Sequence, residues 1–120
     1  MYGLSKDLDL NFLSGREIEQ IAIGSHEIIF AFDEDVSITV YSEFRFFDGQ
    51  DEYIWTPEPA GPQIAARTLS LLGAVIQNFK GRQDGTLSLA FSNAQRLIIL
   101  DSSKEYESYA ITRPGSTIVI

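Results

Sequence analysis

The chain has 120 residues, 44% of them hydrophobic, a formal net charge of −8 and no cysteine. This composition is typical of an ordinary globular domain, and it excludes disulfides, thiol chemistry and zinc sites built from thiolates. The charge is uneven: residues 1–60 hold thirteen acidic residues against three basic ones, whereas residues 61–120 hold four against six. Because an acidic chain repels phosphate backbones, we expect no nucleic-acid ligand and favour a basic protein partner.

The beginning of the chain bears on its location. Asp7 and Asp9 stand where a signal peptide needs a basic start and an uninterrupted apolar core. Nowhere does an apolar run approach the roughly 20 residues of a membrane-spanning helix. We therefore expect a cytoplasmic protein that does not enter a membrane.

The first half of the chain is predicted to hold one short helix and three strands. The helix covers residues 6–13 and ends at Gly15. Strands are expected over residues 16–23, 27–32 and 36–46, and the last is long enough that it should bend or change partners. In the first strand the apolar residues depart from strict alternation between Ile18 and Ile21, which indicates a β-bulge.

Residues 47–62 interrupt the strand pattern with three of the four prolines and two glycines, so we predict a long loop. An aromatic residue ringed by acids is typical of a contact surface for a basic partner. The candidate partner-binding residues in this loop are therefore Asp51, Glu52, Tyr53 and Trp55, the only tryptophan. The alternative is that Trp55 folds back onto the hydrophobic core.

The second half is predicted to begin with a helix over residues 63–72. Ile64, Leu69 and Leu72 lie toward one side of this helix, and Gly73 ends it. Three strands follow, at residues 74–80, 86–92 and 96–101, and the first of them repeats the irregular spacing at Ile76. Two further short β segments are expected within residues 106–120.

The two halves repeat each other at an offset of about 59 residues, which predicts one common core. The ten aligned apolar residues are Ile28, Phe30, Phe32, Ile38 and Val40 in the first half and Leu87, Leu89, Phe91, Leu97 and Ile99 in the second. We predict a single α+β domain over residues 1–120. Two helix-plus-three-stranded-meander repeats (about 5–46 and 63–101) and C-terminal strands (106–120) form a mostly antiparallel sheet, with the helices packed on one face.

Residue types that carry chemistry do not form a catalytic set. The only histidine, His26, lies in a predicted turn without a second histidine for a metal site or a catalytic triad. The consecutive acids Asp33, Glu34 and Asp35 point in different directions and do not converge on a cation. We therefore predict no catalytic residue, no metal site and no cofactor, and a protein that is not an enzyme.

One polar cluster offers an alternative function. Tyr106, Glu107 and Tyr109 place a carboxylate beside two tyrosine hydroxyls, a combination that can bind a small ligand or transfer protons. Tyrosines in strands more often pack with the hydroxyl at the rim of the core, which is the structural alternative.

Several phrases of the sequence resemble a group of known domains. L-x-G-x-x-I and L-x-L-x-F-x-x-x-x-x-L-x-I, followed by Asp101-Ser102-Ser103 and YESY-x-I at residues 106–111, are similar to small bacterial domains of unknown function. Some of those domains resemble immunity proteins of polymorphic toxin systems. The resemblance covers residues 13–40 and 69–120 and implies no catalytic residue. It implies an interaction role, for example as an inhibitor that caps a basic enzyme.

Self-association is a further expectation. Ile98 and Leu100 lie opposite Leu97 and Ile99, so their strand is apolar on both faces. The predicted helices cover only part of a sheet face, and the segment 116–120 is a possible sheet edge. We therefore expect a two-fold homodimer, with a monomer as the alternative.

Overall fold

The structure is a computed structural model that describes residues 4, 8–59 and 61–120. Within these ranges the chain forms ten strands and three short helical segments. The helical segments are η1 (Asn11–Leu13), α1 (Gly61–Ala65) and η2 (Ala66–Leu71), of which the two η segments are 3-10 helices. The strands are β1 (Ile18–Ile23), β2 (Ile28–Phe32), β3 (Ser37–Val40), β4 (Glu43–Phe47), β5 (Glu52–Trp55), β6 (Ile76–Gly81), β7 (Leu87–Phe91), β8 (Arg96–Leu100), β9 (Tyr109–Arg113) and β10 (Ser116–Val119).

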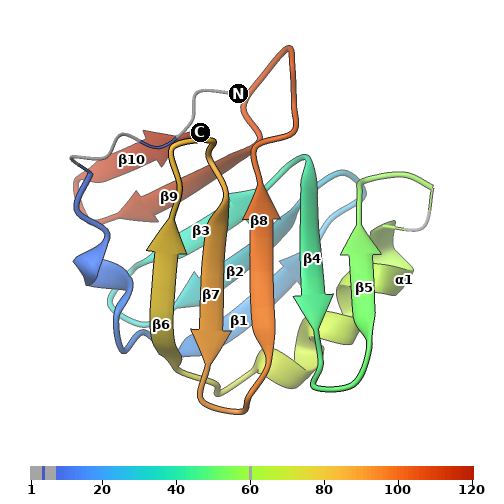
Figure 1. Cartoon of the computed structure of the whole chain (residues 1–120), viewed down its shortest axis with the longest axis horizontal. Coiled ribbons are helices and arrows are strands. Elements are labelled where there is room, and N and C mark those ends of the chain that lie inside the picture. The colour runs from blue at the N-terminus through green and yellow to red at the C-terminus, as the bar shows by residue number, and fades with distance from the viewer. Residues whose placement is uncertain (1–3, 5–7, 60) are drawn as a thin grey trace.

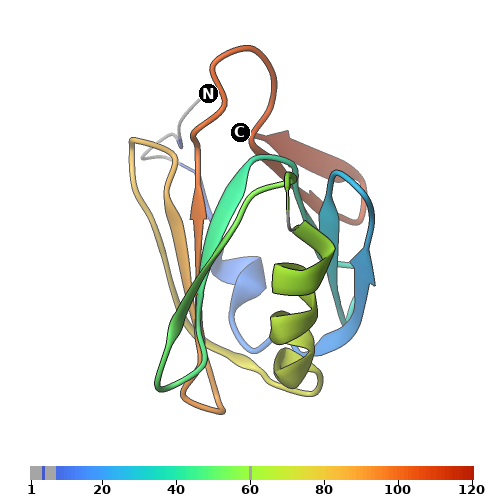
Figure 2. The ribbon, with the colours of Figure 1, turned by 90° about the vertical axis from the view of Figure 1, so that its right-hand side faces the viewer.

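The strands form two antiparallel sheets that face each other. The orders are β1-β2-β3-β9-β10 in one sheet and β5-β4-β8-β7-β6 in the other. The second sheet stands in front in Figure 1, and the strands of the first run obliquely behind it. Seen from the side, the sheets are two layers with the hydrophobic core between them (Figure 2). This arrangement is a β-sandwich.

The predicted α+β fold, with two helix-plus-meander repeats and helices on one sheet face, is therefore wrong. The apolar faces of the two sheets cover each other, so neither face needs a helix to bury it. The helical segments α1 and η2 lie instead at one open side between the sheets (Figure 2). At the N-terminus only η1 is helical among the described residues of 6–13; residues 6 and 7 lie outside the described ranges.

The buried side of the 63–72 segment also differs from the prediction. Leu69 and Leu72 are 44% and 49% exposed, whereas Ala65, Thr68 and Leu71 are fully buried. In a 3-10 helix every third residue lies on the same side, so the buried positions follow a spacing of three instead of the 3.6 of an α-helix. Thr68 is tolerated in the core because its hydroxyl donates a hydrogen bond of 2.7 Å to the carbonyl oxygen of Ala65.

The segment 36–46 changes sheets, as its length suggested. β3 belongs to the first sheet and β4 to the second, and Tyr41 and Ser42 connect them. The predicted loop 47–62 is wrong in part, because it contains β5. Asp48 closes the β4–β5 turn by accepting hydrogen bonds from the backbone N–H groups of Gln50 (2.9 Å) and Asp51 (2.8 Å).

The predicted core and the predicted bulges are confirmed. All ten aligned apolar residues are at most 3% exposed. The β1–β2 pairing shifts register between Ile18 and Gln20, and the β6–β7 pairing shifts between Ile76 and Asn78. Because both bulges fall at equivalent positions, the two meanders twist in the same way.

Equivalent hydrogen bonds join the two halves. The Gly15 N–H donates to the Ile76 carbonyl and the Gly73 N–H donates to the Ile18 carbonyl, both at 2.9 Å. Glu17 and Val75 form an antiparallel bridge at the centre of this contact. Farther along, β3 pairs with β9 and β4 pairs with β8. Each meander is thus extended by the hairpin that follows the other meander.

Candidate functional site

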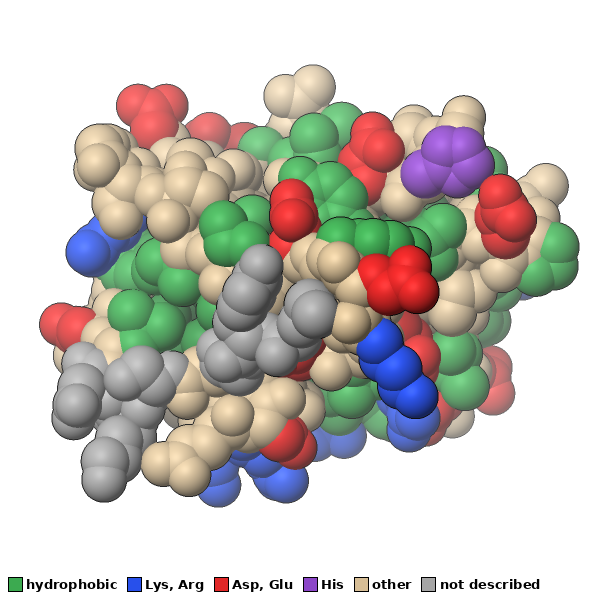
Figure 3. Space-filling view, turned by 90° about the horizontal axis from the view of Figure 1, so that it is seen from above, with side chains coloured by type: hydrophobic (Ala, Val, Ile, Leu, Met, Phe, Trp, Pro, Cys, Tyr) green, Lys and Arg blue, Asp and Glu red, His purple; other side chains and the backbone are tan. Residues whose placement is uncertain are grey.

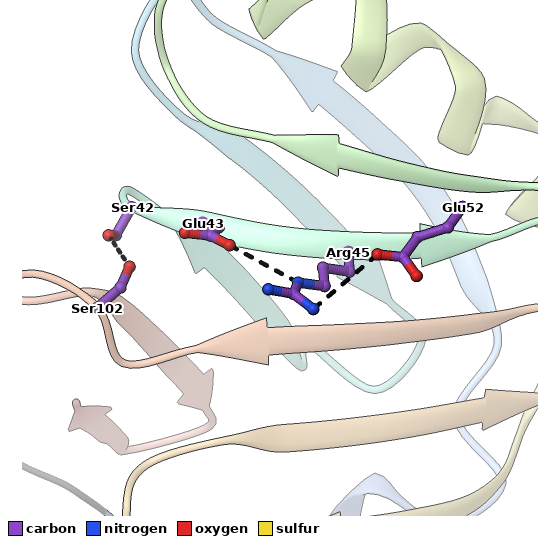
Figure 4. A network of polar contacts seen from close by, with 5 residues as sticks. All are labelled: Ser42, Glu43, Arg45, Glu52 and Ser102. Atoms are coloured by element: carbon purple, nitrogen blue, oxygen red, sulfur yellow. Dashed lines mark hydrogen bonds and ion pairs between the residues drawn. The ribbon is translucent and has the colours of Figure 1, made fainter.

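Two connections cross between the sheets, and they meet at one end of the sandwich. The first consists of Tyr41 and Ser42 between β3 and β4, and the second of the eight residues 101–108 between β8 and β9. The hydroxyl oxygens of Ser42 and Ser102 are 2.6 Å apart (Figure 4). The Tyr41 N–H also donates to the carbonyl oxygen of Ser108 at 2.9 Å. The longer connection is therefore held against the shorter one.

The 101–108 connection is fixed at its base and exposed at its tip. Ser108 is fully buried, donates to a carboxylate oxygen of Asp101 at 2.7 Å and accepts the Ser103 N–H at 3.0 Å. The Tyr106 N–H donates to the Ser103 hydroxyl at 3.3 Å. The ring of Tyr106 is nevertheless 60% exposed. The connection thus presents an aromatic side chain on an anchored backbone.

An open groove of about 720 Å³ lies beside these connections. We call it the acidic groove; its lining residues are His26, Glu27, Tyr41, Thr56, Pro57, Glu58, Tyr106 and Glu107. They come from the β1–β2 turn, the first crossover, the β5–α1 connection and the second crossover. Seen from above, the only histidine lies with acidic side chains close by (Figure 3).

The charge of the acidic groove is negative. Glu27, Glu58 and Glu107 supply three carboxylates, and no lysine or arginine is among the described residues that line the groove. His26 approaches Glu58, with 3.9 Å between Nδ1 and Oε1, and both side chains are largely exposed. Carboxylates beside tyrosine faces favour a cation, which gains both charge attraction and cation–π contact.

The residues predicted for partner binding in the 47–62 segment are not brought together. Trp55 is 1% exposed and stacks on Phe44 with ring centroids 5.1 Å apart, so it occupies the alternative position in the core. Asp51 is exposed. Glu52 is 4.0 Å from Arg45, which also reaches Glu43 (Figure 4).

Tyr53 and Asp48 are likewise engaged within the chain. The guanidinium of Arg67 lies 5.1 Å from the centroid of the Tyr53 ring. Hydrogen bonds from the backbone N–H groups of Asp51 and Gln50 lower the pKa of the Asp48 carboxyl. The cations and N–H groups of this surface thus offset its negative charge, in contrast to the acidic groove.

The alternative cluster is divided. Tyr106 and Glu107 line the acidic groove. Tyr109 is fully buried, and its hydroxyl donates to the carbonyl oxygen of Gly85 at 2.7 Å. Burial raises the pKa of this hydroxyl well above its usual value, with a smaller contribution from the charge of Asp84. Tyr109 therefore has a structural place in the core.

Six of the eight lining residues of the acidic groove were not predicted as site residues: His26, Glu27, Tyr41, Thr56, Pro57 and Glu58. Each lies in or beside a connection between elements, where function concentrates. Their proximity depends on how the two sheets stack, which no local pattern encodes. The signal that the sequence does contain is the position of His26 and Glu27 in a turn and of Glu58 in a proline-rich connection.

Two absences apply to the described part of the chain. In residues 4, 8–59 and 61–120, no group of three or more histidine and acidic side chains is placed to hold a metal ion. Over the same residues, no helix is long and apolar enough to cross a membrane.

One family model matches residues 10–120, and its description is a family of unknown function (DUF6188). The chain belongs to the DUF6188 family. The match extends from the residue before η1 to the residue after β10 and so includes the acidic groove of this DUF6188 chain. Nothing in the family match links it to immunity proteins. Neither the curated proteins nor the solved structures contain a match to the chain.

Proposed function

We propose that this protein is a non-enzymatic interaction domain whose acidic groove binds a basic segment of a protein partner. The observation that supports this proposal is the composition of the groove: among the described residues, three carboxylates and two tyrosines line it, without a lysine or arginine. The exposed ring of Tyr106 offers a face on which a lysine or arginine can stack.

The expected mode of binding follows from exposure. Glu58 is largely exposed, and Glu107 is exposed as well, so each ion pair with a partner contributes little and is screened by salt. Long-range attraction by the acidic half of the chain mainly accelerates association. The partner should therefore bind reversibly, with an affinity that falls as ionic strength rises.

A more specific form of this proposal is an immunity-type inhibitor that acts in the cytoplasm and covers a basic enzyme. The excess of acidic residues in the first half suits such a partner. Loss of the enzyme's activity on mixing with this protein, together with restoration of activity by groove variants, would support this form.

The alternative is a small cationic ligand held by Tyr106 and Glu107. Tyr41 adds a second tyrosine beside them in the groove, whereas Tyr109 lies in the core and takes no part. An enzyme that uses all three residues of the original cluster would need the buried Tyr109 hydroxyl at the surface.

Fluorescence anisotropy with a labelled peptide of alternating lysine and glycine tests the groove. The variant Glu58→Gln/Glu107→Gln removes two groove charges and should weaken binding about tenfold. Glu19→Gln/Asp35→Asn is the matched control, because it removes two exposed charges elsewhere and should leave the affinity nearly unchanged. Equal weakening by both double variants would show that only net charge matters and would contradict the proposal. If free arginine amide displaces the peptide and binds with a similar dissociation constant, the small-ligand alternative is favoured.

A further inference from the structure

The four strands at the sheet edges differ in how they are protected against pairing. β1 and β6 each carry a register shift and a charged residue, Glu19 and Lys80 respectively. β5 carries Glu52 and packs against α1. By contrast, β10 has the sequence Ser-Thr-Ile-Val, without charge or proline, and pairs with β9 in unbroken register. Edge strands without such features are available for pairing with another strand.

Two residues of β10 direct their backbone N–H and C=O groups away from β9. The Ile120 N–H donates to the Tyr109 carbonyl at 2.9 Å, and the Tyr109 N–H donates back at 3.4 Å, so these residues form a hydrogen-bonded pair. Hydrogen-bonded pairs alternate along an antiparallel ladder, so Ile118 is the next residue bonded to β9. The N–H and C=O groups of Thr117 and Val119 are therefore directed outward. Among the described residues, no strand lies beyond them in the sheet.

The outer face next to this edge is uncharged. Two rows of paired residues cross the sheet to β10: Ile29, Thr39, Ala110 and Val119 in one row, and Ala31, Ser37, Thr112 and Thr117 in the other. A chain with a net charge of −8 repels its own copies wherever its carboxylates approach each other. Two copies that approach each other at this edge would bring no carboxylates of these rows together. A charged partner would find no opposite charge in these rows to bind.

We propose that β10 pairs with β10 of a second copy, antiparallel and across a two-fold axis, so that two five-stranded sheets join edge to edge. One register uses both outward residues: Thr117 lies opposite Val119 of the second copy, and Ile118 lies opposite its own equivalent on the axis. Thr117 and Val119 then exchange backbone hydrogen bonds at both ends of the contact. Other two-fold registers leave one of the two residues without a partner strand.

The side chains match this register. Val119 is 44% exposed and would be covered on the outer face by the threonine of the second copy. Ile118 is half-buried against the core, and its equivalent would complete the cover on the inner face. The contact is short, so the area that it buries is smaller than in stable complexes, and the dimer dissociates on dilution.

Hydrogen exchange measured by NMR at several protein concentrations tests the pairing directly. The Thr117 and Val119 amides should exchange more slowly as concentration rises, whereas the Ile118 amide, bonded within the sheet, should not change. Protection of Thr117 and Val119 that is already complete at the lowest concentration would show that the chain's own residues satisfy them and would overturn the proposal. Free exchange of both amides at every concentration would overturn it equally.

Sedimentation equilibrium with charge variants provides the second measurement. Val119→Lys should raise the dimer dissociation constant at least tenfold, because it buries a charge at the edge. Ile23→Lys is the matched control: Ile23 is 37% exposed on β1, at the opposite edge of the same sheet, and the variant has the same net charge. Val119→Thr should dimerise like the wild type. A single wild-type species at the 13.4 kDa chain mass, or equal weakening by the two lysine variants, would refute the β10 contact.

Discussion

Both crossover connections carry the chain from one sheet to the other, but they differ in length. Tyr41 and Ser42 suffice to carry the chain from one sheet to the other, whereas the second crossover uses residues 101–108. Because two residues are enough, six of those eight residues are not needed to change sheets. They form an anchored projection that lines the acidic groove with Tyr106 and Glu107. The repeated scaffold supplies the core, and the longer crossover adds Tyr106 and Glu107 to a groove whose other lining residues come from three other connections.

Substitutions at equivalent core positions of the two halves should lower the free energy of unfolding by similar amounts. Phe32 and Phe91 occupy matching places and are 3% and 2% exposed. Replacement of either by alanine leaves a cavity and should lower the free energy of unfolding by about 3–5 kcal/mol. Urea denaturation of the two variants measures the loss. A loss below about 1 kcal/mol at one of the two positions would show that the halves do not share one core.

Glycines at the start of the two meanders give the next largest effect. Gly15 and Gly73 have φ angles of +77° and +84°, in the left-handed region, and no atom lies within 4 Å of an added Cβ. Alanine at either position should therefore cost roughly 1–2 kcal/mol through backbone conformation alone. Thermal denaturation of both variants checks this expectation. Clearly unequal losses of stability would show that the two glycines are not equivalent and would contradict this prediction.

The long crossover should show a sharp division between base and tip. Ser108→Ala removes the hydroxyl that bonds Asp101 and Ser103, at a fully buried position, and should cost about 1–3 kcal/mol. Tyr106→Ala removes an exposed ring and should change stability by less than about 0.5 kcal/mol. The same variant should weaken binding of the lysine–glycine peptide. A large loss of stability in Tyr106→Ala would show that the Tyr106 side chain supports the fold and would contradict this prediction.

Much of the β structure could be predicted from the sequence because the strands have local signals. The alternation at β2 and β7 and the repeated irregularity at β1 and β6 are visible in the residues themselves. β5 was missed because its four residues stand between Gly49 and the proline-rich residues 57–62. The stacking of two sheets was missed because alternation identifies a buried face without identifying what covers it.

The candidate site was less predictable than the core. Tyr106 and Glu107 were found from their pattern, and they do line the groove. For Trp55 the sequence left two positions open, a contact surface because a single tryptophan lies among acids, and the hydrophobic core. The place of Trp55 in the strand, directly opposite Phe44, directs the ring inward. The groove itself depends on connections far apart in the chain, whose proximity follows from the β3–β9 and β4–β8 pairings.

Those two pairings also constrain how the chain reaches its native state. Neither meander acquires its fourth and fifth strands until the hairpin after the other meander has arrived. Closing such distant contacts costs chain entropy before the core compensates for it, so folding should be slow for a chain of this length. A peptide that ends after β5 would hold a meander and a hairpin that cannot join the same sheet. In such a peptide β3 would lack β9 and β4 would lack β8, so each unit would expose an unpaired edge.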